Sequence, residues 1–197
     1  MGYPQPLERM SDQQYLAWEN AFVQGRHEFV DGEVFAMTGT SMNHNEATLN
    51  LIGTLRKALA GSPCRAFGMD IKVRVAAANA FFYPDIVVAC DAQDFSREGP
   101  GIIESPKVVI EVASPSTSEY DAMGKFARYR LSPTLMEYVL ISADNHDLTV
   151  HRKQADGQWV IADASTPQTL ELKSLELSIP FAEIFANVRY VAPPTDR

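Results

Sequence analysis

The sequence contains only two cysteines, Cys64 and Cys90, and neither lies in a CxxC pair or beside clustered histidines. A structural zinc site usually needs four such ligands at short spacings, so this scarcity argues against one. The 197 residues include 46% hydrophobic side chains, which is enough to build a core without disulfide bonds. We therefore expect both cysteines to be reduced thiols inside the core, as is usual for a cytoplasmic protein.

Long apolar runs are also missing. No run approaches the roughly 18 apolar residues of a membrane-spanning helix. The first residues lack the cationic start and apolar segment that are typical of a signal peptide. These two absences predict a cytoplasmic protein with no membrane partner.

The charge balance lacks the basic excess of proteins that coat nucleic acid. Lys and Arg number 17 against 25 Asp and Glu, which gives a formal net charge of −8. A polyanion would need a local basic patch, and the candidates are Lys72 with Arg74, or Lys125 with Arg128 and Arg130. Short clusters of this kind are also typical of ordinary solvated faces, so both interpretations stay open.

Periodicity, capping and turn signals predict one domain over residues 1–197, because no repeat or long linker divides the chain. Either Ser41 or Asn43 caps the long second helix, and Asp31-Gly32 is a hairpin turn. In order, we expect a helix at 11–22, strands at 27–30 and 33–37, a helix at 41–61, strands at 70–75, 81–90 and 107–114, a helix to about 131, a strand at 136–142, a β meander and a short helix at 180–185. This order predicts an α+β (α/β) fold with a mixed central sheet flanked by helices.

Glu111 is a carboxylate in the middle of the apolar strand sequence KVVIEVAS. Its neighbours on both strand faces are apolar, so the carboxylate needs a cation or hydrogen-bond donors to offset the cost of burial. Asp85 follows Pro84, which has no N–H for a ladder and so marks a strand start or a bulge, where a side chain can turn toward a cleft. If the two strands pair, the carboxylates of Asp85 and Glu111 meet and can bind a hard cation such as Mg²⁺.

The following helix offers a cation for such a site. Asp121, Lys125 and Tyr129 are spaced four residues apart and share one helix face, so Lys125 can point toward the two carboxylates. Each residue also has a simpler interpretation: Asp85 as a turn residue, Glu111 as half of a salt bridge across the sheet, and Lys125 as a surface residue.

The motifs that carry these residues are, in order, EFVDGE, an Asn-His pair that opens the second helix, FFYPDIVV, VVIEVASPST, YDAMGKFARYR and MEYVLI. Together they resemble the Uma-two family of predicted endonucleases, which belongs to the restriction-endonuclease-like PD-(D/E)XK superfamily. The resemblance covers about residues 12–186. It implies a restriction-endonuclease-like core, whose order of helix, three strands, helix and strand agrees with the order predicted from the pattern.

The resemblance also implies site residues. Asp85 and Glu111 match the two acids expected to bind Mg²⁺ or Mn²⁺, and the carbonyl of Val112 is a further expected ligand. The superfamily places a lysine two residues after the second acid, where this chain has Ala113. In the Uma-two pattern the lysine stands on the next helix, which implies Lys125 as its replacement.

Other positions are assigned more loosely. Glu28 matches an acidic position of the family and is expected to support the metal or its water. His44 either approaches the cleft from the start of its helix or merely caps and packs that helix. Tyr129 either orients Lys125 or a phosphate, or belongs to the core. Three further residues are expected to shape the loop and the helix cap: Ser114, Ser116 and Asp121.

These assignments predict a Mg²⁺-dependent or Mn²⁺-dependent endonuclease that hydrolyses phosphodiester bonds, with DNA as the expected nucleic acid partner. A homodimer would gather the basic faces of this acidic chain into one groove. Ala113 motivates a second hypothesis, a nuclease-fold module for binding or assembly with little or no catalytic turnover. A metal-dependent hydrolase of smaller phosphoesters is a third.

Overall fold

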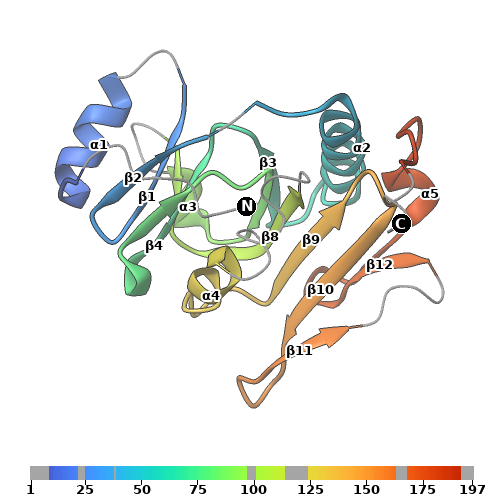
Figure 1. Ribbon diagram of the computed structural model, residues 1–197. Helices are drawn as coiled ribbons and strands as arrows, with labels where there is room; N and C mark the ends of the chain where they lie inside the picture. The colour runs from blue at the N-terminus through green and yellow to red at the C-terminus, as the bar shows by residue number, and fades with distance from the viewer. Residues whose placement is uncertain are drawn as a thin grey trace.

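The computed structural model describes residues 9–21, 25–37, 39–96, 101–113, 124–162 and 168–191. Two main sheets with helices packed against them make up a mixed α+β fold, as the sequence predicts (Figure 1). The predictions for Ser114, Ser116 and Asp121 lie outside the described residues.

The larger sheet has six strands in the order β11-β10-β9-β8-β6-β3. The strands are β3 (Arg65–Gly68), β6 (Ile86–Ala89), β8 (Pro106–Ala113), β9 (Glu137–Ser142), β10 (Asp147–Lys153) and β11 (Trp159–Ala162). β8 and β9 run parallel, whereas the other neighbours are antiparallel. A parallel pair needs a crossover connection, and the chain between these strands contains α4 (Phe126–Tyr129). The predicted mixed sheet is confirmed.

The smaller sheet has five strands in the order β2-β1-β5-β4-β7. The strands are β1 (His27–Val30), β2 (Glu33–Ala36), β4 (Lys72–Val75), β5 (Ala80–Phe82) and β7 (Ile102–Ile103). Asp31 and Gly32 join β1 to β2 with positive φ angles of 50° and 90°, as a two-residue hairpin turn requires. The predicted hairpin is therefore confirmed.

The chain changes sheets at Pro84. The prediction of one strand over residues 81–90 is wrong, because β5 belongs to the smaller sheet and β6 to the larger one. Pro84 has no N–H to donate to a ladder, so the chain can turn there between the two sheets. Asp85 lies in this turn, outside both strands.

The two long helices begin where the sequence predicts. α1 (Asp12–Ala21) opens with the capping box, in which Ser11 N–H donates to Gln14 Oε1 at 2.9 Å. α2 (Met42–Ala58) is capped by Ser41, whose hydroxyl accepts the N–H of His44. Ser41 rather than Asn43 is thus the cap. The described residues also form α3 (Ala92–Ser96), α5 (Phe181–Ile184), two 3-10 helices, η1 (Ala76–Ala78) and η3 (Lys173–Leu175), and a two-stranded sheet of β12 (Thr169–Leu172) and β13 (Leu177–Pro180).

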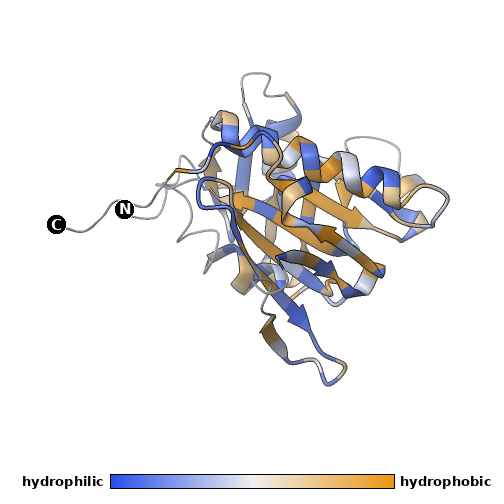
Figure 2. Cartoon of the chain, turned by 90° about the vertical axis from the view of Figure 1, so that its right-hand side faces the viewer, coloured by the Kyte–Doolittle hydropathy of each residue, from blue (hydrophilic) through white to orange (hydrophobic). Residues whose placement is uncertain are grey.

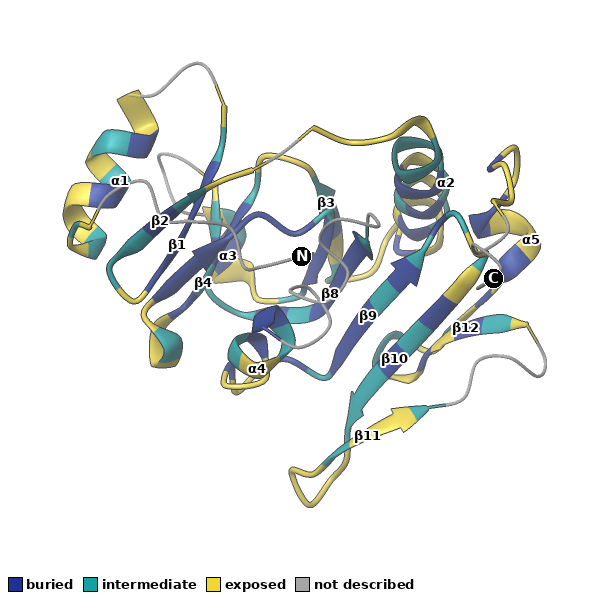
Figure 3. Ribbon diagram, viewed as in Figure 1, coloured by how far each residue is buried: buried dark blue, intermediate teal, exposed yellow. Residues whose placement is uncertain are grey.

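The core lies on both faces of the larger sheet, whose strands are mostly hydrophobic (Figure 2). Val108 and Ile110 of β8 pack on the side of α2, and Val109 packs on the opposite side with Tyr129 and Tyr138. β8 is therefore buried on both faces, as predicted, and is dark along most of its length in Figure 3. A charged residue in this strand needs partners inside the protein.

Two expectations from the sequence are wrong. Cys64 and Cys90 form a disulfide, because the pairing of β3 with β6 brings these neighbouring positions opposite each other. Lys72 is buried, and its Nζ donates to Asn20 Oδ1 at 3.3 Å. Arg74 pairs with Glu104, so Lys72 and Arg74 do not form an exposed basic patch.

Among the described residues, no helix is both long enough and apolar enough to cross a bilayer.

The packing of α2 predicts a contrast between two leucines of the same helix. Leu51 is fully buried in the core, whereas Leu49 is 49% exposed. Leu51→Ala should lower the free energy of unfolding by about 2–5 kcal/mol, because it removes apolar contacts and leaves a cavity. Leu49→Ala should change it by less than about 0.5 kcal/mol. Urea denaturation followed by circular dichroism measures both, and equal losses would contradict this packing.

Candidate functional site

The pairing of β6 with β8 brings the main chains of Asp85 and Glu111 to the same end of the ladder. The two strands are antiparallel, with Ile86 opposite Ile110 and Val87 opposite Val109. Continuing that register by one residue places Asp85 opposite Glu111 at the end of the ladder. The pairing expected from the sequence is present, and it brings the two acids to one end of the larger sheet.

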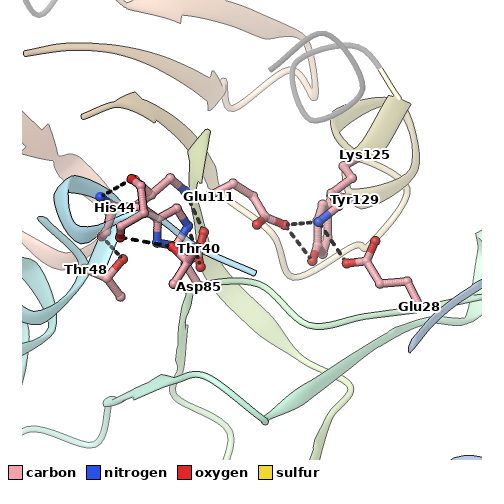
Figure 4. Close-up of polar contacts among 10 residues, drawn as sticks. Glu28, Thr40, His44, Thr48, Asp85, Glu111, Lys125 and Tyr129 are labelled. Atoms are coloured by element: carbon pink, nitrogen blue, oxygen red, sulfur yellow. Dashed lines mark hydrogen bonds and ion pairs between the residues drawn. The ribbon is translucent and has the colours of Figure 1, made fainter. Parts of the chain in front are cut away.

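Glu111 is 3% exposed and has two hydrogen-bond donors on its Oε1. Lys125 Nζ lies 3.3 Å away and the hydroxyl of Tyr129 lies 3.4 Å away (Figure 4). Both donors come from the chain segment around α4, on the side of the sheet opposite α2. The structure thus contains the contact between Lys125 and Glu111 that the helical spacing predicts.

Lys125 also contacts Glu28, which comes from β1 of the smaller sheet. Its Nζ lies 2.8 Å from Glu28 Oε1, and the lysine and the glutamate are only 6% and 5% exposed. The same Glu28 oxygen accepts the main-chain N–H of Tyr83 at 3.4 Å. Lys125 is therefore held between two carboxylates from different sheets, where water screens the charges weakly.

Tyr129 is fully buried beside this charged group. Burial raises the pKa of Tyr129 well above its ordinary value, and the negative charge of Glu111 raises it further, while Lys125 opposes the rise. The hydroxyl consequently keeps its proton at neutral pH and donates to Glu111. Its ring packs against Phe82 and Tyr138, so Tyr129 serves the core and the site together.

Asp85 has a different set of partners. Its Oδ1 lies 3.1 Å from Nε2 of His44, and its Oδ2 accepts the main-chain N–H of Val112 at 2.7 Å. His44 belongs to the first turn of α2, so the Asn-His motif does reach the acid that follows Pro84. In Figure 4 the Asp85 carboxylate points toward His44, and the Glu111 carboxylate points away toward Lys125.

The donor set suits a hard divalent cation. Mg²⁺ needs only one or two protein carboxylates and completes its shell with water, and Asp85 and Glu111 supply two carboxylates at one sheet end. Within the described ranges, no group of three or more His, Cys, Asp or Glu side chains is arranged to hold a metal ion. The two carboxylates are too few for an all-protein cage, and a water-rich Mg²⁺ site stays a prediction. Val112 contacts Asp85 through its N–H, and its carbonyl stays a predicted ligand.

Sequence reasoning missed a second buried polar group that borders the site. Glu19 accepts the hydroxyl of Tyr83 at 2.9 Å and pairs with Nδ1 of His27 at 2.9 Å. His27 and Tyr83 adjoin Glu28 and Pro84, respectively, so this group fixes the main chain on both sides of the site. The only sequence signal was the position of Glu19 one turn after Tyr15 on the buried face of α1.

Comparison with known proteins places this geometry in a family. Residues 12–182 match the model of the Uma2 family, described as "Putative restriction endonuclease". Protein slr1290 of Synechocystis sp., described as uncharacterized, is 34% identical over 185 residues, or 94% of this chain and 96% of the relative. Protein sll1609 of the same organism, also described as uncharacterized, is 30% identical over 150 residues, or 76% of this chain and 84% of the relative.

A solved structure shares the fold. It is described as a putative nuclease from Anabaena variabilis, and it aligns with a TM-score of 0.72 over 90% of this chain and 98% of its own. The identity is 17%, so this likeness concerns the fold, and it supports the restriction-endonuclease-like core that the sequence predicts. The family match spans most of the chain and confirms the resemblance in the motifs, and the chain therefore belongs to the Uma2 family of putative restriction endonucleases.

Proposed function

We propose that this protein is a metal-dependent endonuclease that hydrolyses phosphodiester bonds in DNA, with Mg²⁺ or Mn²⁺ as its cofactor. The observation that carries the proposal is the 3.3 Å contact between Lys125 Nζ and Glu111. The superfamily motif has a lysine two residues after its second acid, and this chain has Ala113 there. Lys125 brings an ammonium group to the same acid from another element.

The proposed roles follow from the contacts. Asp85 and Glu111 would hold the metal, which when bound polarises a phosphoryl oxygen and lowers the pKa of a bound water. Lys125 would balance the negative charge that develops on the phosphate during hydrolysis. Glu28, 2.8 Å from Lys125, would hold the ammonium group in position. Tyr129 would orient Glu111 through its hydroxyl.

The acidic net charge of −8 bears on how DNA would reach this site. A homodimer that joins two basic surfaces would provide a local attraction that the whole chain lacks. Of the basic pairs in the sequence, Lys72 is buried and the partly exposed Arg74 is paired with Glu104, which leaves the region of Arg128 and Arg130 as the candidate surface. The homodimer and a cytoplasmic location stay proposals.

The binding-module hypothesis rested on the missing lysine at Ala113. An ammonium group beside Glu111 weakens that reason, because the charge the reaction needs is present although its position in the sequence has changed. The two hypotheses differ in turnover: the module binds nucleic acid and does not cleave it.

The acids of the site give the first functional prediction. Glu111→Gln and Asp85→Asn should each slow cleavage of plasmid DNA by about 10²–10³-fold or more, because each removes a charge that would bind the metal. Agarose gels of digests in Mg²⁺ and in Mn²⁺ measure the rate. Glu171→Gln is the matched control, because Glu171 is an exposed acid on β12, and it should cleave at the wild-type rate. Equal cleavage by all four proteins would sink the proposal.

Lys125 gives the second functional prediction. Lys125→Met should reduce cleavage by about 10²–10³-fold while Mn²⁺ still binds, because the lysine is proposed to balance charge on the phosphate and not to hold the metal. Isothermal titration calorimetry gives the affinity, and plasmid digestion gives the rate. Lys57→Met changes an exposed lysine in the last turn of α2 and should alter neither quantity.

Folding must be checked beside these measurements, because Lys125→Met leaves Glu28 and Glu111 without this ammonium group. Lys125→Arg keeps a cation there and serves as the second variant. A folded Lys125→Met protein that cleaves as fast as the wild type would refute the role of Lys125. A wild-type protein that binds DNA but does not cleave it with either metal would support the module instead.

A further inference from the structure

His44 connects α2 to an acid of the proposed site. Its Nε2 lies 3.1 Å from Asp85 Oδ1, and its main-chain N–H is taken by the cap residue Ser41. The carbonyl of His44 accepts the hydroxyl of Thr48 at 2.8 Å. The backbone of His44 is thereby fixed on both sides, which leaves the imidazole directed at Asp85 (Figure 4).

The second ring nitrogen of His44 has no hydrogen-bond partner among the described residues. Nδ1 is buried and makes no hydrogen bond within the described part of the protein. A carboxylate only accepts hydrogen bonds, so the contact with Asp85 requires the hydrogen on Nε2. A hydrogen on Nδ1 would be a buried donor with no acceptor, which is costly. The contacts thus select the tautomer with hydrogen on Nε2.

The Asp85 carboxylate is consequently held by one donor on each oxygen. His44 Nε2 holds Oδ1 and the main-chain N–H of Val112 holds Oδ2. Each carboxylate oxygen has two lone pairs, so one on each remains for a cation. Two donors on different elements fix the plane of the carboxylate without using up its capacity as a ligand.

We infer that His44 is a positioning residue that orients Asp85 for a divalent metal by donating a hydrogen bond from Nε2. This inference rests on the proposed metal-dependent function. An imidazole bonded through one N–H suits the task better than a lysine or arginine would, because a fixed cation at 3 Å would compete with the metal for the same carboxylate. His44 therefore acts on metal affinity through Asp85 and need not touch the phosphate.

The test uses Mn²⁺ binding to the full chain, measured by isothermal titration calorimetry. His44→Leu removes the donor and should weaken Mn²⁺ binding about 10- to 100-fold, as loss of a group that orients a metal ligand typically does. His44→Gln has an amide nitrogen at a similar reach and should bind nearly as tightly as the wild type. His44→Lys keeps a donor but adds a charge, and should bind more weakly than His44→Gln.

The control and a second readout keep the outcomes distinct. Asn45→Leu, the next residue of α2, changes a side chain with no hydrogen bond in the described part of the chain and should bind Mn²⁺ as the wild type does. Wild-type binding with an equally tight His44→Leu variant would overturn the role of His44 alone. No binding by the wild type would overturn the metal site and this role together.

The tautomer can be read without any metal. Nitrogen-15 NMR of the histidine rings in the metal-free protein should show the hydrogen of His44 on Nε2. A hydrogen on Nδ1 would overturn the inference even if the protein proves to be a nuclease. The signal of His146, whose Nε2 lies 3.1 Å from the carbonyl of Val188, provides an internal reference for a ring bonded through Nε2.

Discussion

The burial of Glu111 is the constraint on which the rest of this structure depends. A carboxylate with 3% exposure in the middle of a strand buried on both faces destabilises the fold unless charges and donors surround it. Those partners come from separate parts of the chain: Lys125 and Tyr129 from the region of α4, and Glu28 through Lys125 from β1. To provide these partners for Glu111, α4 and the smaller sheet must both approach the same end of β8.

Pro84 determines where the second acid, Asp85, lies relative to Glu111. A continuous strand from β5 into β6 would direct Asp85 by simple alternation and keep its main chain in a ladder. The switch between sheets at Pro84 takes Asp85 out of both ladders, and its carboxylate reaches the main chain of Val112 and the first turn of α2. Tyr83 lies just before this turn. Its N–H donates to Glu28 and its hydroxyl donates to Glu19. One proline therefore connects the two sheets and builds one side of the site.

Much of this arrangement follows from local sequence signals. The Asp31-Gly32 turn, the Ser11 capping box and the apolar run of β8 each have a short-range cause, and the structure contains all three. The pairing of the strands that carry Asp85 and Glu111 also follows from their order in the chain. These signals depend on residues close in sequence, which is why they can be interpreted without coordinates.

The features that sequence reasoning missed depend on long-range packing. In the apolar run of residues 81–90, Pro84 marks an irregularity, but nothing local indicates that the residues before and after it belong to different sheets. Lys72 lies at a position that the alternating pattern assigns to solvent. In the structure α1 covers it, and Asn20 accepts a hydrogen bond from its ammonium group. The disulfide between Cys64 and Cys90 likewise follows from the register of β3 with β6, which no local pattern specifies.

The two acids of the proposed site differ in what surrounds them, and this difference suggests a division of labour. Glu111 faces an ammonium group that offsets its charge, whereas Asp85 faces an imidazole and a main-chain N–H. A divalent cation would be attracted more strongly to a carboxylate without an ammonium group beside it, so Asp85 is the better placed of the two proposed ligands. Lys125 is paired with Glu28 as well as with Glu111, so its ammonium group is held between two carboxylates beside the proposed site. The contact that allows Glu111 to be buried therefore also fixes the position of Lys125.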